Sequence, residues 1–513
     1  MRNSGRWIAL RDPRVHAPVT QRNWIGAAIG LALCSTTLAS CSVKENGSGQ
    51  SASPEASSLN LEWKSDTEKQ LIDAIQQAPA NGLKPDLFLK GGEKGAALTD
   101  AALKYASALA NGYSDPTQLH EVYTIPHPKV DVRPGLQQAI QKGDVKGWLD
   151  SLVPQTDEYR ALSQAHLHFL QLASQGQFQP VEDGKAIKPG SRDPRVAQVA
   201  GALRSVGYLE QPQEQQPTKP PATPASASRP TVYSGELVAA VKRLQAEFGF
   251  KQDGIIGGNT LNALNAGPAW RARQLAVAME RLRWLPRNPP ETRIDVNTAA
   301  STLDYWREGS RVDHRNVVVG EPDKPTPQLR APIVRLVAKP TWRVPKGIGE
   351  KELADKNPSW LQENGYVLKD DQWVQESGPK NSLGLVKFDM QDKEAIYLHD
   401  TPAKAIFGMD DRHRSHGCVR VENAVQFATA IAEQEGVLDQ FQEAMQGEDE
   451  TFIKLPQEIP VRLLYETTFW DGSAVRFRQD VYGWDDNVAK ALGLAPGTPV
   501  KIEQPESSDD IGP

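Results

Sequence analysis

The sequence contains little cysteine: three of its 513 residues, Cys34, Cys41 and Cys418. Cys34 and Cys41 fall within an N-terminal segment that has the features of an export signal, so one thiol remains in the rest of the chain. This count excludes a framework of disulfides as the basis of stability. A lone thiol in an oxidising compartment is unusual unless the protein uses it.

The chain also lacks a large excess of charge of either sign. Its formal net charge is −6, and 39% of its residues are hydrophobic, which is enough to build cores. Proteins that bind nucleic acid usually present a strongly basic face, so we expect no nucleic-acid partner. A chain of this length is too long for one ordinary domain and predicts about three.

The N-terminal segment lacks an apolar run long enough to cross a membrane, because its stretch of apolar or small residues covers only 24–38. This stretch follows several arginines and ends in Leu-Ala-Ser-Cys, which resembles the bacterial lipobox. In a lipobox the cysteine is lipidated and becomes the mature N-terminus. We therefore expect residues 1–41 to be a lipoprotein signal peptide with Cys41 as its lipidation site. The alternative is an ordinary cleaved signal in which Cys41 is incidental.

Residues 42–59 are rich in Ser, Gly, Glu and Asn and predict a flexible tether between a bilayer and the first domain. Ser42, rather than Asp, after the lipobox cysteine resembles the enterobacterial lipoproteins that are sorted to the outer membrane. More than one acyl chain makes such an anchor stable. We therefore expect a periplasmic protein that is attached to the outer membrane through lipid.

Two helical regions are predicted after the tether. In residues 60–185 apolar side chains recur at helical spacing, for example at 98, 102, 105 and 109, and we expect a helical scaffold without chemistry of its own. Residues 192–266 predict a small three-helix module. A low-complexity loop rich in Pro and Gln, at 211–229, interrupts this module and is unsuited to a core.

The remainder of the chain is predicted to be mainly β-structure. Runs rich in Val and Ile, punctuated by Gly and Pro, predict strands at 293–297, 316–319 and 333–338, and closing strands at 461–465 and 475–477. Residues 385–399 predict two strands with a turn at 391–392. A helix with a turn at Gly436 is expected over 423–446. Residues 342–384 lack a clean period and resemble a long insertion that acts as a lid. We assign residues 270–485 to this domain and 486–513 to a C-terminal tail.

The third cysteine stands in the segment Arg-Ser-His-Gly-Cys-Val-Arg, at 414–420. A free thiol has a pKa of about 8.5, so it needs a base, positive charge or backbone donors to act as a nucleophile. His399 ends an apolar strand upstream, His416 is close in sequence, and Gly417 lets backbone amides approach an oxyanion. Together these groups meet the needs of acyl transfer.

Two other interpretations fit the residue types alone. Cys418 could be a buried structural cysteine, which is the ordinary place for a free thiol. Alternatively, Cys418 and three histidines, His399, His413 and His416, could supply four zinc ligands. Their irregular spacing resembles no common zinc motif.

The segment Tyr-Leu-His-Asp-Thr-Pro at 397–402, followed by Ser-His-Gly-Cys-Val-Arg at 415–420, resembles the active-site signature of L,D-transpeptidases of the YkuD type. Thr-Pro at 326–327, Asn-Ser-Leu-Gly at 381–384 and Asp-Val-Tyr-Gly at 480–483 add to this likeness. Residues 192–266 resemble the peptidoglycan-binding-like module of bacterial wall enzymes. The order of scaffold, binding-like module and catalytic domain is similar to that of the large proteobacterial members. The resemblance implies an α+β multi-domain fold with a mainly β catalytic domain and an inserted capping subdomain.

The resemblance also implies roles for individual residues. Cys418 would be the nucleophile, His399 its base, and His416 a residue that helps to fix the site. Arg420, Ser415 and Tyr397 would position substrate or steady the loop. The amides of Gly417 and Cys418 would bind the oxyanion. Trp342 and Tyr397 are candidate wall contacts, with core packing as the alternative, and Asp400 stands where relatives often have Gly or Ser.

The implied reaction joins peptidoglycan stem peptides. Cys418 would attack the amide between diaminopimelate and the terminal D-Ala of a tetrapeptide donor, and a neighbouring diaminopimelate amine would take the acyl group to give a 3→3 cross-link. The family needs no metal or organic cofactor and is a target of carbapenems. Water as acceptor would give a carboxypeptidase or hydrolase, and a lipoprotein lysine would give an anchoring enzyme. A function of a different class is a non-catalytic wall-binding scaffold.

Overall fold

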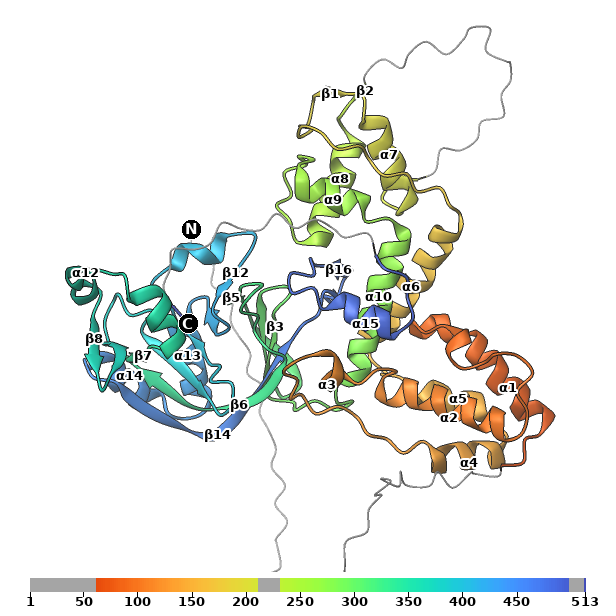
Figure 1. Cartoon of the computed structure of the whole chain (residues 1–513), viewed down its shortest axis with the longest axis horizontal. Helices are drawn as coiled ribbons and strands as arrows, with labels where there is room; N and C mark the ends of the chain where they lie inside the picture. The colour runs from red at the N-terminus through yellow and green to blue at the C-terminus, as the bar shows by residue number, and fades with distance from the viewer. Residues whose placement is uncertain (1–60, 211–230, 498–511) are drawn as a thin grey trace, which may run out of the picture. The chain divides into compact units, whose positions relative to one another are not determined.

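The computed structural model describes residues 61–210, 231–497 and 512–513 (Figure 1). The predicted signal peptide with Cys41, the tether and the Pro-rich loop lie outside these residues. Within them, no helix has both the length and the apolar character that a membrane crossing requires. Helical modules come first in the chain and a large mixed sheet follows, so the predicted α+β multi-domain class is confirmed.

The first module is helical, as the apolar periodicity predicts. Its main helices are α1 (Ser65–Gln76), α2 (Ala96–Asn111), α4 (Arg133–Lys142) and α5 (Val145–Leu152). Shorter elements are the 3₁₀ helices η1 (Ala78–Asn81) and η2 (Pro85–Leu87) and the helix α3 (Pro116–Leu119). Asp144 caps α5, because its carboxylate accepts a hydrogen bond from the Gly147 amide at 2.9 Å. Val277 and Trp284, from a helix much later in the chain, complete the buried core of this module.

The second module contains the three helices that the sequence predicts: α7 (Val196–Ser205), α8 (Glu236–Phe248) and α9 (Gly258–Asn265), with a short pair of strands, β1 (Arg192–Asp193) and β2 (Thr231–Val232). Two long helices, α6 (Asp157–Ser174) and α10 (Pro268–Trp284), pack against each other and contribute to the same core. Phe477, from near the end of the chain, is also buried there.

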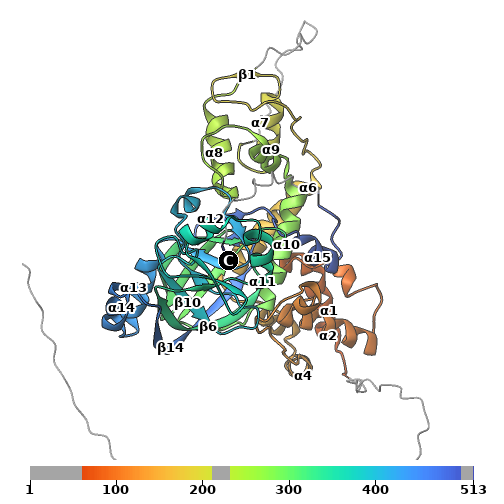
Figure 2. The same ribbon diagram turned by 60° about the vertical axis from the view of Figure 1, so that its left-hand side comes forward.

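A nine-stranded sheet forms the third part, with strand order β12-β5-β13-β11-β10-β6-β14-β3-β4. Because β4 also pairs with β5, the sheet closes on itself. The strands are β3 (Arg293–Asn297), β4 (Thr302–Arg307), β5 (Ser310–Gly320), β6 (Leu329–Ala338), β10 (Val386–Met390), β11 (Leu398–His399), β12 (His413–Ser415), β13 (Val419–Val421) and β14 (Thr451–Leu464). Helices α13 (Ala424–Gln434) and α14 (Leu438–Gln446) pack on β10 and on β6 and β14, respectively (Figure 2).

The predicted insertion at 342–384 is a small subdomain with its own core. It holds β7 (Trp342–Arg343), α11 (Lys346–Ile348), η3 (Gly349–Leu353), α12 (Pro358–Glu363), β8 (Tyr366–Lys369) and β9 (Gln372–Gln375), and its strands form a separate sheet in the order β7-β9-β8. Trp342 and Leu353 are among its fully buried residues. The elements are too short to give a clear hydrophobic period, which explains why the sequence shows none.

After β14 the chain returns to the helical modules. It forms a hairpin of β15 (Thr468–Trp470) and β16 (Val475–Phe477), followed by α15 (Asp485–Ala491). The hairpin contacts α6, and α15 packs against α10. The expected closing strand at 461–465 is the end of a longer strand, since β14 begins at Thr451. Strand β4 was not among the expected strands.

Candidate active site

Pairing of strands brings the two halves of the motif together. β11 runs parallel to β13, with Leu398 opposite Val419 and His399 opposite Arg420. The Val419 amide donates a hydrogen bond to the Tyr397 carbonyl at 3.1 Å, just before the strand pair begins. Cys418 directly precedes β13, so in this register it lies level with Tyr397, two residues before His399 on the neighbouring strand.

The His399 ring is fully buried, and its Nδ1 lies 2.5 Å from the Asp400 carbonyl oxygen. A carbonyl oxygen only accepts, so Nδ1 carries the proton and Nε2 offers a lone pair. Among the described residues Nε2 has no hydrogen-bond partner. Burial lowers the pKa of His399 well below its usual value, and the charge of Arg420 lowers it further. The ring is therefore neutral and arranged to accept a proton.

The Cys418 side chain is also buried, with 6% of the residue exposed. Its Sγ lies 3.8 Å from the Ala395 carbonyl oxygen, so in this conformation the thiol points to Ala395 rather than to His399. Burial raises the pKa of the Cys418 thiol to about 11, although hydrogen bonds from Tyr397 lower it in part. The resting pair is thus a neutral thiol and a neutral imidazole. Catalytic hydrogen bonds often tighten only when substrate binds.

The loop that carries Cys418 depends on a glycine and a serine. Gly417 has φ +116°, a backbone conformation that side-chain-bearing residues rarely adopt. The Ser415 hydroxyl donates to the Cys418 carbonyl at 2.6 Å and accepts from the Gly417 amide at 3.1 Å. Since Ser415 engages the Gly417 amide, the Cys418 amide is the better candidate for an oxyanion donor. Ser415 steadies this loop and is fully buried.

His416 connects the loop to the capping subdomain. Its Nε2 lies 2.5 Å from Oε1 of Glu352 in η3, and the same carboxylate lies 3.9 Å from the Lys324 ammonium. The sequence motif gave no sign of Glu352, because nothing in the motif points to a partner in the insertion. His416 therefore holds the cap against the loop, in addition to any contact with substrate.

Asp400 acts through two different groups. Its backbone carbonyl holds His399, while its carboxylate accepts from the Leu385 amide at 3.0 Å and pairs with Lys404. Gly384 has φ +62°, and a Cβ there would lie 2.4 Å from the Asp400 carboxylate. The side chain thus anchors the turn at 381–384 and leaves orientation of the His399 ring to the main chain.

The remaining candidate site residues pack inside the sheet domain and its capping subdomain. Trp342 is 1% exposed and belongs to the core of the cap, which favours the packing interpretation. Tyr397 packs against both that core and the core of the sheet, with the Lys387 ammonium 4.2 Å from its ring centre. Arg420 is buried on β13, and a Cβ on Gly512 would lie 2.9 Å from its guanidinium.

The three histidines of the zinc interpretation are engaged elsewhere. His413 Nδ1 lies 2.7 Å from the Asp411 carboxylate, and its Nε2 lies 3.0 Å from the Thr298 carbonyl. His416 contacts Glu352, and His399 contacts Asp400. Across residues 61–210 and 231–497 no group of three His, Cys, Asp or Glu side chains could hold a metal ion.

Family models match most of the described chain. Residues 291–502 match the model described as "L,D-transpeptidase catalytic domain", named YkuD. Residues 62–165 match a "Scaffold domain", and residues 192–264 match a "Putative peptidoglycan binding domain". Together the three models bear out the resemblance that the sequence motifs indicate.

A curated protein of Haemophilus influenzae, described as "Putative L,D-transpeptidase", is 28% identical over 240 residues, which are 42% of this chain and 49% of that protein. The match thus spans about half the length of that relative. Among solved structures, the L,D-transpeptidase of Xylanimonas cellulosilytica is 16% identical, with 56% of this chain and 100% of that chain covered and a TM-score of 0.20. The L,D-transpeptidase of Mycobacterium smegmatis is 12% identical, with 34% and 58% covered and a TM-score of 0.19.

Proposed function

Because the chain carries an L,D-transpeptidase catalytic domain together with scaffold and peptidoglycan-binding domains, we propose that it forms 3→3 cross-links between peptidoglycan stem peptides. The observation that supports this most directly is the state of His399. Its Nδ1 is held by a main-chain carbonyl, its Nε2 has no partner among the described residues, and strand pairing places it beside the Cys418 segment.

In the first step, His399 Nε2 takes the proton of the Cys418 thiol as sulfur attacks the carbonyl of the diaminopimelate residue in the donor stem. The Cys418 amide stabilises the oxyanion. The amide bond to D-Ala then breaks, and the departing amine takes the proton from the imidazolium of His399. A thioester between Cys418 and the donor stem remains.

In the second step, the side-chain amine of a neighbouring diaminopimelate attacks the thioester carbonyl. The carbon–sulfur bond breaks, a new amide forms, and the proton lost by the amine returns to the Cys418 sulfur through His399. A water molecule would give hydrolysis at the same carbonyl. The capping subdomain, attached through the Glu352–His416 contact, favours the amine because it limits the access of water.

Incubation of the soluble enzyme, without residues 1–41, with purified tetrapeptide muropeptides tests this function. Mass spectrometry should show cross-linked dimers that carry a diaminopimelate–diaminopimelate bond and release of D-Ala. Cys418→Ala should abolish both products while the fold stays intact. Shortened monomers without dimers would instead identify a hydrolase, and products formed by the alanine variant would refute Cys418 as the nucleophile.

The site of action follows from the N-terminal segment. We propose that Cys41 is lipidated and anchors the enzyme in the periplasm, on the outer membrane, where its substrate lies. Mass spectrometry of the N-terminal peptide from cells should find an acylated Cys41. A free amine on a later residue would show an ordinary cleaved signal instead.

A further inference from the structure

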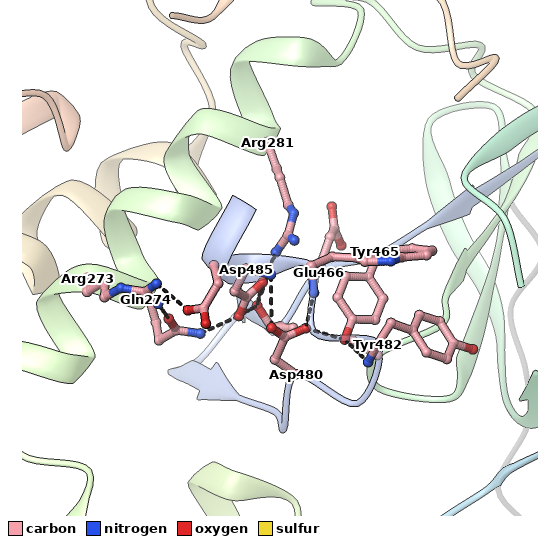
Figure 3. A network of polar contacts seen from close by, with 12 residues as sticks. Arg273, Gln274, Arg281, Tyr465, Glu466, Asp480, Tyr482 and Asp485 are labelled. Atoms are coloured by element: carbon pink, nitrogen blue, oxygen red, sulfur yellow. Dashed lines mark hydrogen bonds and ion pairs between the residues drawn. The ribbon is translucent and has the colours of Figure 1, made fainter. Parts of the chain in front are cut away.

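A chain of buried polar contacts links the Cys418 loop to helix α10 of the helical modules. Part of it is drawn in Figure 3, where Gln274 and Arg281 contact Asp485 and Arg273 contacts Gln274. In the same view the Tyr465 hydroxyl contacts Asp480 and the Tyr482 amide. None of these side chains has a part in the proposed reaction. Their connection to the active site begins at the carbonyl of Gly417.

Thr326 is the first member of the chain. It is fully buried, and its hydroxyl donates a hydrogen bond to the Gly417 carbonyl at 2.8 Å. The same oxygen accepts from the Gly320 amide at 2.8 Å, so both functions of the hydroxyl are used. A side chain from outside the motif therefore fixes the direction of the Gly417 carbonyl.

That direction matters because a trans peptide unit is planar. The Gly417 carbonyl and the Cys418 amide belong to one peptide unit and point in opposite directions. Fixing the carbonyl therefore aims the Cys418 N–H, which is the candidate oxyanion donor. The positive φ of Gly417 is the backbone rotation that permits this placement of the unit.

Tyr482 holds the turn that presents Thr326. Its hydroxyl donates to the Gly320 carbonyl at 2.7 Å and lies 3.4 Å from the Thr326 amide. Gly320 has no room for a side chain, because a Cβ would lie 2.2 Å from the Lys324 carbonyl oxygen. The two ends of this turn are thus tied to one phenol.

Two acids, the half-buried Asp480 and the buried Asp485, hold Tyr482 in turn. Its amide donates to the Tyr465 hydroxyl at 3.0 Å, and that hydroxyl donates to the Asp480 carboxylate at 2.7 Å. The amide of Asp485 also donates to Asp480, at 2.9 Å, and the Asp485 carboxylate accepts from Arg281 of α10 at 2.5 Å. Both partners of this last ion pair are at most 5% exposed.

We propose that Thr326 and Tyr482 are positioning residues that aim the oxyanion donor of the Cys418 loop without touching substrate. This role rests on the proposed acyl transfer, and it identifies the residues that fix the geometry of the Cys418 loop. Loss of the Thr326 hydroxyl leaves the Gly417 carbonyl unheld, so the oxyanion is stabilised less well. Removing one oxyanion donor outright slows reactions about 100- to 1000-fold, and a misdirected donor should slow acylation by about 10- to 100-fold.

Two reactions at the same thiol test this proposal. Acylation by a carbapenem forms an oxyanion, whereas alkylation by iodoacetamide displaces iodide and forms none. Stopped-flow measurement separates the binding constant of the carbapenem from the rate of acylation. Thr326→Val should slow acylation about 10- to 100-fold while the binding constant and the alkylation rate stay unchanged. Thr326→Ser, which keeps the hydroxyl, should restore the rate.

Two further variants complete the test. Tyr482→Phe, which keeps the ring, should slow acylation selectively but by a smaller factor than Thr326→Val. It replaces Thr326→Val in the test if that variant fails to fold. Thr341→Val is the matched control, since its hydroxyl contacts Glu450 at 3.2 Å and has no contact with the Cys418 loop. Equal losses in both reactions, or unchanged acylation in Thr326→Val, would overturn the proposal. Wild-type enzyme that carries no carbapenem adduct on Cys418 would instead refute the proposed function.

Discussion

Glu352 is the point at which closure of the cap over the active site can be weakened by one substitution. Its carboxylate meets His416 at 2.5 Å, and it stands on η3, within the inserted subdomain. Glu352→Gln keeps the size of the side chain and removes its charge. We therefore expect the cap to open more often without loss of the fold.

The size of the effect follows from the exposure of the pair. A hydrogen bond to a charged group contributes about 1.5–3 kcal/mol when it is well buried. His416 and Glu352 retain 13% and 24% exposure, and the amide of glutamine still offers a weaker hydrogen bond. We expect closure to lose about 1 kcal/mol, which raises the population of the open form about fivefold.

The assay is the partition of the thioester between amine and water. Hydrolysis through the open form should rise in proportion to its population, so the ratio of hydrolysed to cross-linked product should increase about fivefold. Mass spectrometry of the muropeptide products gives this ratio directly. Glu350→Gln is the matched control, since its contact with Lys346 is 3.7 Å long and both side chains are largely exposed.

A double-mutant cycle shows whether His416 is the partner that matters. If the contact is the cause, Glu352→Gln should add little to the product ratio of a His416→Gln variant. The reasoning fails if Glu352→Gln leaves the ratio unchanged, or if Glu350→Gln changes it equally.

Two further predictions concern pH. Because the pKa of His399 lies well below 6.5 and that of Cys418 is about 11, acylation by a carbapenem should be nearly as fast at pH 5.5 as at pH 7.5. A histidine with the ordinary pKa would lose about tenfold over that interval, and such a loss in the measured profile would contradict a neutral resting pair. The second prediction concerns stability, because burial, together with the charge of Glu158, raises the pKa of Glu466 from 4.5 to about 8. Between these values the folded state binds more protons than the unfolded state, so the free energy of unfolding falls as pH rises. Glu466→Gln, which imitates the protonated acid, should flatten the decline of Tm from pH 5 to pH 8, and an unchanged slope would show that Glu466 stays ionised.

The sequence predicted the parts of the site that depend on local pattern. The order of helical modules before a sheet follows from hydrophobic periodicity, and the motif at 415–420 is contiguous in the chain. The start of β14 was missed because its alternation is broken: its register shifts between Lys454 and Ile459, and the residues between them are mostly exposed. A period of two is hard to recognise across such an irregularity.

Contacts between distant segments were beyond the reach of sequence patterns. Glu352 and His416 are 64 residues apart, and Arg281 and Asp485 are 204 apart. Each partner by itself looks like an ordinary charged residue. Thr326 and Tyr482 were within segments that resemble the family, but nothing in those segments shows that they meet at the Gly417 carbonyl.

The neutral resting pair also explains how one thiol would persist in the oxidising periplasm that we propose as the location of this protein. The thiolate is the form that oxidants attack, so a reactive cysteine is usually one whose pKa is lowered. Here burial raises the thiol pKa to about 11, and the charge of Arg420 disfavours the imidazolium of His399 that would stabilise a thiolate. Sulfur therefore becomes nucleophilic chiefly as the proton passes to His399 during attack on a bound substrate. Burial therefore makes Cys418 a slow target for oxidants. It also means that activation of the sulfur depends on an oxyanion donor that already points at the substrate carbonyl. We assign the orientation of this donor to Thr326 and Tyr482.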